Sequence, residues 1–478
     1  MKESVKNMEA IVREVLFRNR ELVNRVSELA AEKKKLAAEK AALEVEVKEL
    51  RGRLSRYEKP VKDSHNSSTP PSRENLRSQA VRRTRSLRTS GVRRTGGQPG
   101  HEGATLLMRE SPDIIETHTP GYCSSCGLSL SSVEGKESET RQSIDIPLPV
   151  CPVVTNHVSI EKVCPCGKCN RGTFPAHVKP GVSYGVNLHA VTAYLSTVQH
   201  IPFKRLTGIL KDLYGIEISQ GTVSNILNRM RRQSRPGHEA IRQSIEKSPV
   251  AGADETGEHV NGILHWMWVF QNALATYIFQ HASRGGAAID GHFPKGLPES
   301  ILVTDRHRSY FNMETAGHQI CLAHLLRELL YLEELDKTQK WASSLLELLR
   351  YSIHQKKSKP LNEIDADSIR ERFDALMNQD LSLLDKQFGA LQKSLIKHDG
   401  HVFRFLEHAD VPYDNNASER SIRPLKVKQN VSGMFKSENG ANAFCQLYSI
   451  VDTARKNNMD PFMALVAVAE NIITPDTS

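Results

Sequence analysis

Three acidic residues stand where separate structural elements are expected to begin or end. Asp254 follows the small residues VAGA in a strand-like run, and Asp305 follows the apolar run SILVT. Glu419 comes shortly after the sequence DNN at 414–416, which favours a turn and the start of a helix. Two strands and a helix bring such acids together only if the chain folds compactly around a mixed sheet. The sequence therefore predicts an acidic site beside a sheet.

Three converging carboxylates suit one kind of chemistry. Carboxylate oxygens are hard ligands for Mg²⁺ or Mn²⁺, and two such ions about 4 Å apart promote in-line displacement at phosphorus. Without a metal ion the acids repel one another and their pKa values rise. We therefore expect Asp254, Asp305 and Glu419 to be catalytic ligands of Mg²⁺ or Mn²⁺. The alternative is that each acid is an ordinary solvated surface group.

Two arginines follow the third acid. The guanidinium groups of Arg420 and Arg423 are suited to holding DNA phosphates near the acidic site. Arg423 also lies four residues after Glu419, so an ion pair within one helix is the alternative. Pro424 is expected to end or kink that helix at once, which argues against a purely helical explanation.

Most of the eight cysteines fall between positions 123 and 169. A CxxC pair is followed by the cluster CPCGKC, and the stretch SIDIPLPVCPVVTNHVSIEKV between them reads as two strands. Two cysteine clusters joined by a hairpin are typical of a zinc ribbon, in which four thiolates hold a structural Zn²⁺. We expect the Zn²⁺ ligands to be Cys123, Cys126, Cys166 and Cys169, while Cys164 remains possible in the second cluster.

The region from 203 to 234 has the pattern of a helix-turn-helix. An apolar-periodic helix stops at Tyr214-Gly215, and Ser219 is suited to cap a second helix. In a DNA-binding version the start of the second helix enters the major groove. The expected DNA contacts are Gln220, Thr222, Ser224 and Asn225 to bases and Arg229 to phosphate. An ordinary helical hairpin is the alternative.

The N-terminal segment carries a heptad repeat. Apolar residues, including Leu22, Leu29, Leu36 and Leu43, recur every seven positions, which keeps one apolar seam along a helix. A lone helix cannot bury such a seam, so the pattern predicts a coiled coil that joins copies of the chain. The alternative is an amphipathic helix packed on its own domain.

A basic segment follows the heptads. Between positions 72 and 100 the sequence has eight arginines, including Arg82, Arg83 and Arg85, and Glu74 is the only acid. A local polycation with few apolar residues favours a flexible linker that contacts DNA phosphates. A solvated spacer is the alternative.

Composition sets the broad class. The 478 residues are 39% hydrophobic, which suffices for several buried cores, and the formal net charge is +9. No apolar run approaches the roughly 20 residues needed to span a bilayer, and the charged N-terminus is unlike a signal peptide. Clustered cysteines suit metal binding in a reducing compartment. We expect a cytoplasmic protein with no membrane partner.

Several of these stretches together resemble a known family. ADETG, VTDRHRSYF, CLAHLLREL and DNNASERSIRPLKVKQNVSGMFKSENGANAF, with GGQPGHEG and the cysteine pairs, are similar to transposases of the insertion sequence 66 family. These are bacterial DDE transposases with an RNase H-like core, built on three antiparallel strands, a parallel fourth and packed helices. The resemblance implies that Asp254, Asp305 and Glu419 are the catalytic triad. Cys321 and His324 match a CxxH signature of the family, with a structural or DNA-contacting role.

The implied fold class is multidomain α+β, with an N-terminal coiled coil, a zinc ribbon, a helical helix-turn-helix domain and an RNase H-like α/β core that carries a helical insertion. We expect these domains: a coiled coil or leucine zipper at 1–58, a basic flexible linker at 59–110, the zinc ribbon at 111–180, the DNA-binding helix-turn-helix at 181–247, the first part of the core at 248–320, the helical insertion at 321–405, and the last part of the core with C-terminal helices at 406–478.

The resemblance also implies an activity. Water attacks the phosphodiester at each transposon end, and the freed 3′-OH then attacks target DNA. The expected partners are double-stranded DNA, further copies of the chain and small accessory transposition proteins. Two other functions remain open: a dimeric DNA-binding regulator without catalysis, and an RNase H-like nuclease that cleaves but does not join strands.

Overall fold

The computed structural model describes residues 2–57, 60, 62, 66, 108–144, 150–175, 178, 181 and 183–473. The chain divides into two compact units. The first contains Met1–Asn75, His157–Thr207 and Ile218–Ser478, and the second contains Leu76–Asn156 and Gly208–Glu217. Each unit is described by itself below.

A five-stranded mixed sheet forms the centre of the first unit, in the order β5-β4-β3-β6-β7. The first three strands are antiparallel neighbours, whereas β6 runs parallel to β3 and β7 runs parallel to β6. The predicted α+β class is confirmed at this level. The strands are β3 (Val250–Val260), β4 (Ile263–Gln271), β5 (Thr276–His281), β6 (Leu297–Thr304) and β7 (Thr315–Ile320).

Alternation along β3 divides its residues between the two faces of the sheet. Ala251 and Ala253 are buried in a core with Trp268 and Phe270 of β4, against Ile241 of α6 (Arg235–Glu246). Gly252 lies on the other face, which α14 (Asn416–Ser432) covers. The edge strand β5 is covered by α15 (Glu438–Lys456), which limits the exposure of an unpaired strand edge.

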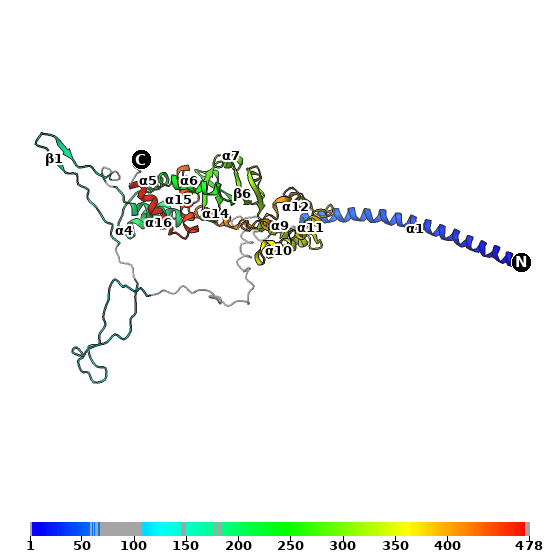
Figure 1. Cartoon of the computed structure of the whole chain (residues 1–478), viewed down its shortest axis with the longest axis horizontal. Coiled ribbons are helices and arrows are strands. Elements are labelled where there is room, and N and C mark those ends of the chain that lie inside the picture. Colours follow the sequence, from blue (N-terminus) through cyan, green and yellow to red (C-terminus); the bar gives the residue numbers. More distant parts are fainter. Residues whose placement is uncertain are drawn as a thin grey trace. The chain divides into compact units, whose positions relative to one another are not determined.

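A group of helices connects β7 to α14 and packs against the sheet (Figure 1). Its leucine-rich core includes Ile301 and Val303 of β6 and Ile320 of β7. The start and the end of this segment lie side by side, because the backbone N–H of Leu322 donates a 2.9 Å hydrogen bond to the carbonyl of Tyr413. The elements are α9 (Leu322–Leu335), α10 (Trp341–Ser358), η3 (Leu361–Glu363), α11 (Ala366–Met377), α12 (Lys386–Lys397), η4 (Asp399–His401) and α13 (Arg404–Glu407).

Further helices complete the fold. In the first unit, α3, α5 and α16 pack on one another, and α5 and α16 also pack on α15. The short helices α7 and α8 flank β6 in the sequence. Their bounds are α3 (Val186–Ala193), η2 (Tyr194–Val198), α4 (Phe203–Tyr214), α5 (Gln220–Gln233), α7 (Gly286–Asp290), α8 (Arg308–Phe311) and α16 (Pro461–Ile473).

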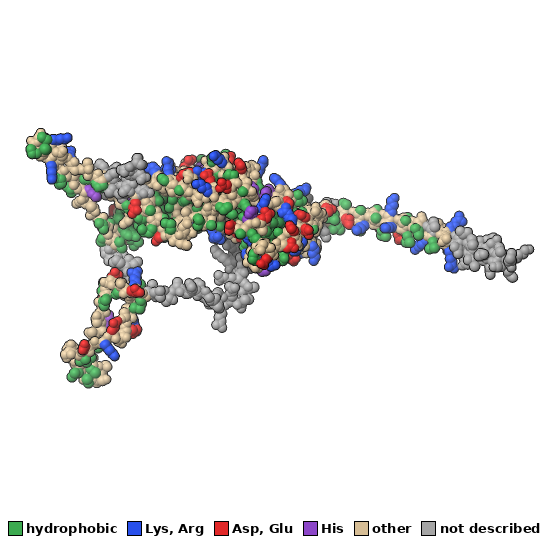
Figure 2. All heavy atoms as spheres, in the orientation of Figure 1, with side chains coloured by type: hydrophobic (Ala, Val, Ile, Leu, Met, Phe, Trp, Pro, Cys, Tyr) green, Lys and Arg blue, Asp and Glu red, His purple; other side chains and the backbone are tan. Residues whose placement is uncertain are grey.

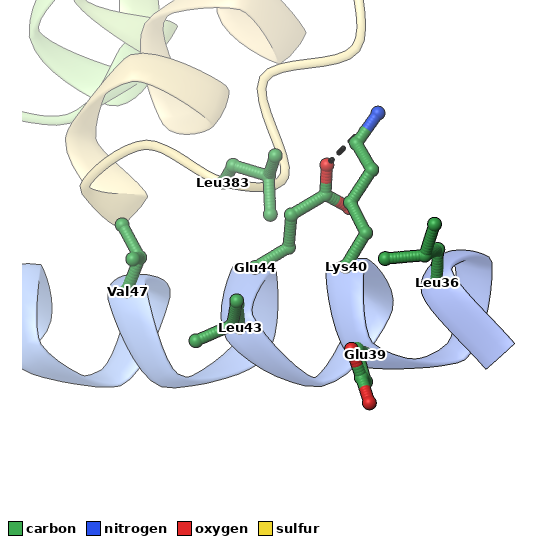
Figure 3. Close-up of a pocket in the computed structure, with 7 residues that line it drawn as sticks. All are labelled: Leu36, Glu39, Lys40, Leu43, Glu44, Val47 and Leu383. Atoms are coloured by element: carbon green, nitrogen blue, oxygen red, sulfur yellow. Dashed lines mark ion pairs between the residues drawn. The ribbon is translucent and has the colours of Figure 1, made fainter.

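The N-terminal residues form one long helix, α1 (Lys2–Tyr57). Hydrophobic side chains remain on its surface (Figure 2). Of the seam residues, Leu36 is 59% exposed and Leu43 is 60% exposed. Leu36, Leu43 and Val47 line a shallow pocket with Leu383, which precedes α12 (Figure 3). This contact leaves most of the seam open. Neither α1 nor another helix in the described ranges has the length and apolarity needed to cross a bilayer.

Candidate active site beside the sheet

Strand register brings the first two acids side by side. Gly252 of β3 pairs with Val303 of β6 in parallel register, and Asp254 and Asp305 each lie two residues further along. Side chains two residues apart in a strand share a face, so Asp254, within β3, and Asp305, directly after β6, occupy neighbouring positions on the same face of the sheet. Local backbone groups orient them: Asp254 Oδ1 accepts from its neighbour's N–H at 2.9 Å, and Asp305 Oδ1 accepts from the N–H of His307 at 2.8 Å.

The third acid is delivered by a close approach of α14 to β3. A Cβ atom at Gly252 would lie 2.6 Å from Ser418 Oγ and 2.9 Å from Asn415 Oδ1, so glycine permits this approach. Asn415 Nδ2 donates to the carbonyl of Ala253 at 2.6 Å, and Ser418 Oγ donates to Asn415 Oδ1 at 2.6 Å. Glu419 follows in the first turn of α14, and these contacts fix it relative to the strand that carries Asp254.

The charges of the three acids act on one another. The pKa of Asp254 is raised well above its usual value, first by burial and then by the charges of Glu255, Asp305 and Glu419. The three carboxylates nevertheless do not meet within 4.8 Å of one another in the described part of the chain.

A second group of side chains adjoins Glu419. Ligand atoms of Cys321, His324 and Glu419 all lie within 4.8 Å of one another. Cys321 caps α9, and its Sγ accepts from the N–H of Asn415 at 3.2 Å. Burial raises the pKa of the Cys321 thiol to about 11 and lowers the pKa of His324, which the charge of Arg327 lowers further.

The two arginines after the third acid are exposed on α14. The expectation that Pro424 would end the helix is wrong, because α14 continues to Ser432. Proline removes one backbone hydrogen bond, but packing of α14 on β3 and β4 stabilises the remaining turns. The alternative of an ion pair between Glu419 and Arg423 is not supported, since among the described residues Glu419 pairs with His324 instead, at 3.8 Å.

The cysteine clusters lie in different units, with Cys123 and Cys126 in one and the second cluster in the other. The expected pair of strands between them is wrong for the residues described there: only Glu161–Val163 is a strand, as β1. Prolines such as Pro152 cannot donate ladder hydrogen bonds, which explains the lack of strand before β1. Instead, β1 pairs with β2 (Cys169–Arg171) across the second cluster.

Each cluster sits in a tight turn. The backbone carbonyl of Cys123 accepts a hydrogen bond from the N–H of Gly127, and the carbonyl of Cys164 accepts one from the N–H of Gly167. The two glycines have positive φ angles, 74° and 83° respectively. In the second turn the pKa of the Cys166 thiol is lowered. The larger cause is a hydrogen bond with the backbone of Lys168, and a hydrogen bond with the side chain of Cys164 adds to it.

In β2, Cys169 is paired with Val163 of β1, and the nearby carboxylate of Glu161 raises the pKa of its thiol. The local geometry therefore associates Cys166 with Cys164. The predicted ligand set, with Cys166 and Cys169, remains a prediction.

The predicted DNA-reading helix is α5. Ser219 caps it as expected, because its side chain accepts from the N–H of Thr222 at 3.0 Å. The predicted apolar face is confirmed, since Val223, Ile226, Leu227 and Met230 are buried. Of the predicted DNA contacts, Gln220 and Asn225 are exposed, whereas Thr222, Ser224 and Arg229 are half-buried. The predicted contacts Arg82, Arg83 and Arg85 lie outside the described residues.

Sequence reasoning missed the residues that join the elements of the site. Gly252, Asn415 and Ser418 position Glu419 relative to Asp254, although none of them is a candidate ligand. The signal for Gly252 was a glycine two residues before a predicted strand acid, which is typical of a close backbone approach. Asn415 was interpreted as a turn residue, but its side chain makes no cap and bonds to β3.

Comparisons with known proteins agree with the resemblance. Residues 181–443 match the model of the family described as Transposase IS66 family, and residues 12–106 match a family of unknown function, DUF6444. Two relatives come from Sinorhizobium fredii (strain NBRC 101917 / NGR234). The uncharacterized protein y4jD is 23% identical over 430 residues, which cover 82% of this chain and 81% of the relative.

The uncharacterized protein y4qI is 21% identical over 331 residues, which cover 60% of this chain and 59% of the relative. Neither relative's name describes an activity. The family match spans more than half of the 478 residues and includes Asp254, Asp305 and Glu419. The chain therefore belongs to the transposase IS66 family.

Proposed function

We propose that this chain is a DDE transposase that binds the terminal inverted repeats of its insertion sequence, cleaves strands there and transfers the 3′-OH into target DNA. The observation that carries the proposal is that Asp254 on β3, Asp305 just after β6 and Glu419 on α14 lie near enough for their charges to act on one another, although they are far apart in the sequence. Family membership supports the same activity.

The acids fit divalent cations by their chemistry. The three candidate ligands Asp254, Asp305 and Glu419 offer only carboxylate oxygens, which Mg²⁺ and Mn²⁺ prefer over softer ligands. The raised pKa of Asp254, caused by burial and neighbouring acids, is the cost that a nearby cation would offset. Ions held there would stabilise the charge on the reacting phosphate oxygens.

The remaining roles belong to the protein itself. Asp254 and Asp305 are held by the paired strands, and Glu419 is held by α14 through Asn415 and Ser418. Arg420 and Arg423 extend into solvent from the same helix, where they are placed to bind phosphates of the DNA strand that enters the site.

The finer architecture belongs to the proposal as well. We assign the sheet and its helices to an RNase H-like core over 248–320 and 406–478, with 321–405 as a helical insertion. The exposed polar start of α5 supports a helix-turn-helix that reads DNA within 181–247. The two cysteine turns support a structural Zn²⁺ site within 111–180. The exposed apolar seam of α1 supports self-association through 1–58.

The test is strand transfer by the purified full chain on DNA that carries the element's terminal repeats, with Mg²⁺ or Mn²⁺. Asp254→Asn, Asp305→Asn and Glu419→Gln should each lower the rate of joined-product formation by at least about 1,000-fold, as losses of residues that act as one catalytic unit do. Each variant should still bind the repeat DNA in a gel-shift assay.

Asp410→Asn is the matched control, because Asp410 is an exposed acid near the start of α14 and outside the site. It should transfer strands at the wild-type rate. Normal transfer by all three site variants would refute the triad. Cleaved but never joined DNA in the wild-type reaction would favour a nuclease, and DNA binding without cleavage would favour a regulator.

A further inference from the structure

The Cys321–His324–Glu419 group is a site that the acidic triad does not explain. Cys321 is the cap of α9, His324 lies in its first turn, and Glu419 lies in the first turn of α14. Residues three apart on a helix share a face, so Cys321 and His324 both face α14. Three different ligand types from two helices thus converge within 4.8 Å.

Two buried atoms of the group have no hydrogen-bond partner among the described residues: Nδ1 of His324 and Oε1 of Glu419. Buried polar atoms are normally paired, so both atoms need an explanation. Nε2 of His324 lies 3.8 Å from Oε1 of Glu419, which is too long for a hydrogen bond. Two such atoms on one tetrahedral ion stand roughly 3.4 Å apart, given metal–ligand bonds of about 2.0–2.2 Å. A small inward movement would therefore let Nε2 of His324 and Oε1 of Glu419 bind one ion, which gives Oε1 a partner and leaves Nδ1 as the N–H of the ring.

The ligand set selects the kind of cation. A thiolate and an imidazole are soft or borderline ligands, which favour Zn²⁺ and similar ions, whereas Mg²⁺ takes oxygen ligands. The N–H of Asn415 donates to Cys321 Sγ at 3.2 Å, and this hydrogen bond partly offsets the burial that otherwise disfavours a thiolate there. Cys321 also stands at the N-terminus of α9, where the helix dipole favours negative charge.

We propose that Cys321, His324 and Glu419 bind one divalent cation of the zinc class, distinct from the Mg²⁺ ligands Asp254 and Asp305. Binding replaces the S–H bond of Cys321 by a sulfur–metal bond and releases that proton to solvent. Three protein ligands leave a fourth tetrahedral position for water.

The site deepens the proposed function because it shares Glu419 with it. One carboxylate oxygen of Glu419 would be held beside His324, and the other would remain free for the acidic site. The cation would thus fix the third acid of the triad in position, between the helical insertion and α14. This sharing is the only part of the inference that rests on the proposed function.

The experiment uses the full chain, stripped of metal with a chelator and titrated with Co²⁺ as a spectroscopic probe for Zn²⁺. Cys321→Ala should bind one Co²⁺ fewer per chain than wild type and lose part of the thiolate-to-cobalt absorption. His324→Ala should weaken binding at this site by more than about 100-fold, because even outer-shell partners are worth roughly 10- to 100-fold. The cysteine turns are unchanged in these variants, so their absorption cancels in the difference spectrum.

Cys445→Ala is the matched control, since Cys445 is equally buried, on α15, and its Sγ lies 3.7 Å from Met267 Sδ rather than near the site. It should bind as much Co²⁺ as wild type. Equal stoichiometry and equal spectra for wild type and Cys321→Ala would overturn the proposal. If circular dichroism shows that Cys321→Ala does not fold, the partly exposed His324 decides: unchanged Co²⁺ affinity in His324→Ala then overturns it.

The Co²⁺ titration and the strand-transfer assay can fail independently of each other. Loss of strand transfer in Asp254→Asn, with unchanged Co²⁺ binding in Cys321→Ala, would leave the transposase standing and remove the second metal site. Co²⁺ binding that depends on Cys321, in a protein that never joins DNA, would support the second metal site and refute the transposase proposal.

Discussion

The acidic site and α1 depart from the usual distribution of residues in opposite ways. At the site, acids are partly buried beside one another, and the pKa of Asp254 rises as a result. On α1, leucines that would normally be buried are exposed, as Leu36 is by 59%. Both arrangements cost free energy in an isolated chain. The comparison supports two of the proposals made above: that a cation binds at the acidic site, and that another apolar helix packs on α1.

The two regions also differ in how they are built. The site joins β3, β6 and α14, so its geometry depends on strand register and on the contacts of Asn415. The seam of α1 depends only on a local seven-residue repeat within one helix. Changes to one region should therefore leave the other unaffected, which makes the comparison testable.

The largest expected effect comes from placing charge on the α1 seam. Burying a leucine is worth roughly 1.5–3 kcal/mol, so Leu29→Lys with Leu36→Lys should weaken pairing of two copies by at least about 10⁴-fold. The double variant should sediment as a monomer. Its sheet-bearing unit should keep the wild-type melting temperature.

The matched control adds the same charge away from the seam. Ala31→Lys with Ala38→Lys lies on the same helix, two residues after each leucine, where a heptad faces solvent. This variant should remain associated. If the leucine variant keeps the wild-type mass, the seam is not the association surface, and the comparison fails for α1.

A smaller effect is expected for a buried acid on β3 that lies away from the site. Glu258 is fully buried, its carboxylate oxygens have no hydrogen-bond partner in the described part of the chain, and burial raises its pKa to about 7. Because the folded pKa exceeds the unfolded one, the folded form is favoured below pH 4.5 and loses that advantage as pH rises through 7.

Glu258→Gln should therefore match wild type at pH 4 and exceed its free energy of unfolding above pH 7, by on the order of 3 kcal/mol. Urea unfolding across pH measures the difference. Added Mg²⁺ should not change it, since this acid is no part of the cation site. If the free energy of unfolding depends on pH in the same way in Glu258→Gln and wild type, the buried Glu258 carboxylate does not destabilise the fold.

The smallest effect comes from filling the space between β3 and α14. Gly252→Ala places a methyl group 2.6 Å from Ser418 Oγ, so α14 must shift, at a cost of about 1–3 kcal/mol. Strand transfer should fall with it, because Glu419 moves away from Asp254. The melting temperature and the transfer rate check both effects.

Gly389→Ala in α12 is the control, because nothing lies within 4 Å of the added Cβ. It should stabilise the helix by up to about 1 kcal/mol and leave strand transfer unchanged. Normal transfer by Gly252→Ala would mean that the approach of α14 does not set the position of Glu419.

The candidate ligands were predictable because each has a local sequence signal. Asp254 and Asp305 follow small or apolar strand residues, and Glu419 follows turn residues. The contacts that join them were not predictable, because they depend on how α14 packs on β3. Asn415 illustrates this: its sequence context indicates a turn, but its partner, the carbonyl of Ala253, is 162 residues away.

Other differences have similar causes. Strand β7 was not expected, since TAGHQI carries few of the β-branched or aromatic residues that mark a strand. Its Gln319 is nevertheless buried, where its side chain bonds to the carbonyl of Val402. The hairpin around the second cysteine cluster was placed too early in the sequence, because the alternating residues before it are interrupted by prolines.

The hydrogen bond from Leu322 to the carbonyl of Tyr413 closes the base of the helical segment between β7 and α14. The two ends of the segment therefore meet beside the site. A shorter connection should keep the acids together if it preserves residues 319–324 and 411–419 and still covers the apolar side chains of β6 and β7 that these helices bury. The same reasoning implies that the separation in sequence between Asp305 and Glu419 carries little information, whereas the residues at the closure carry much.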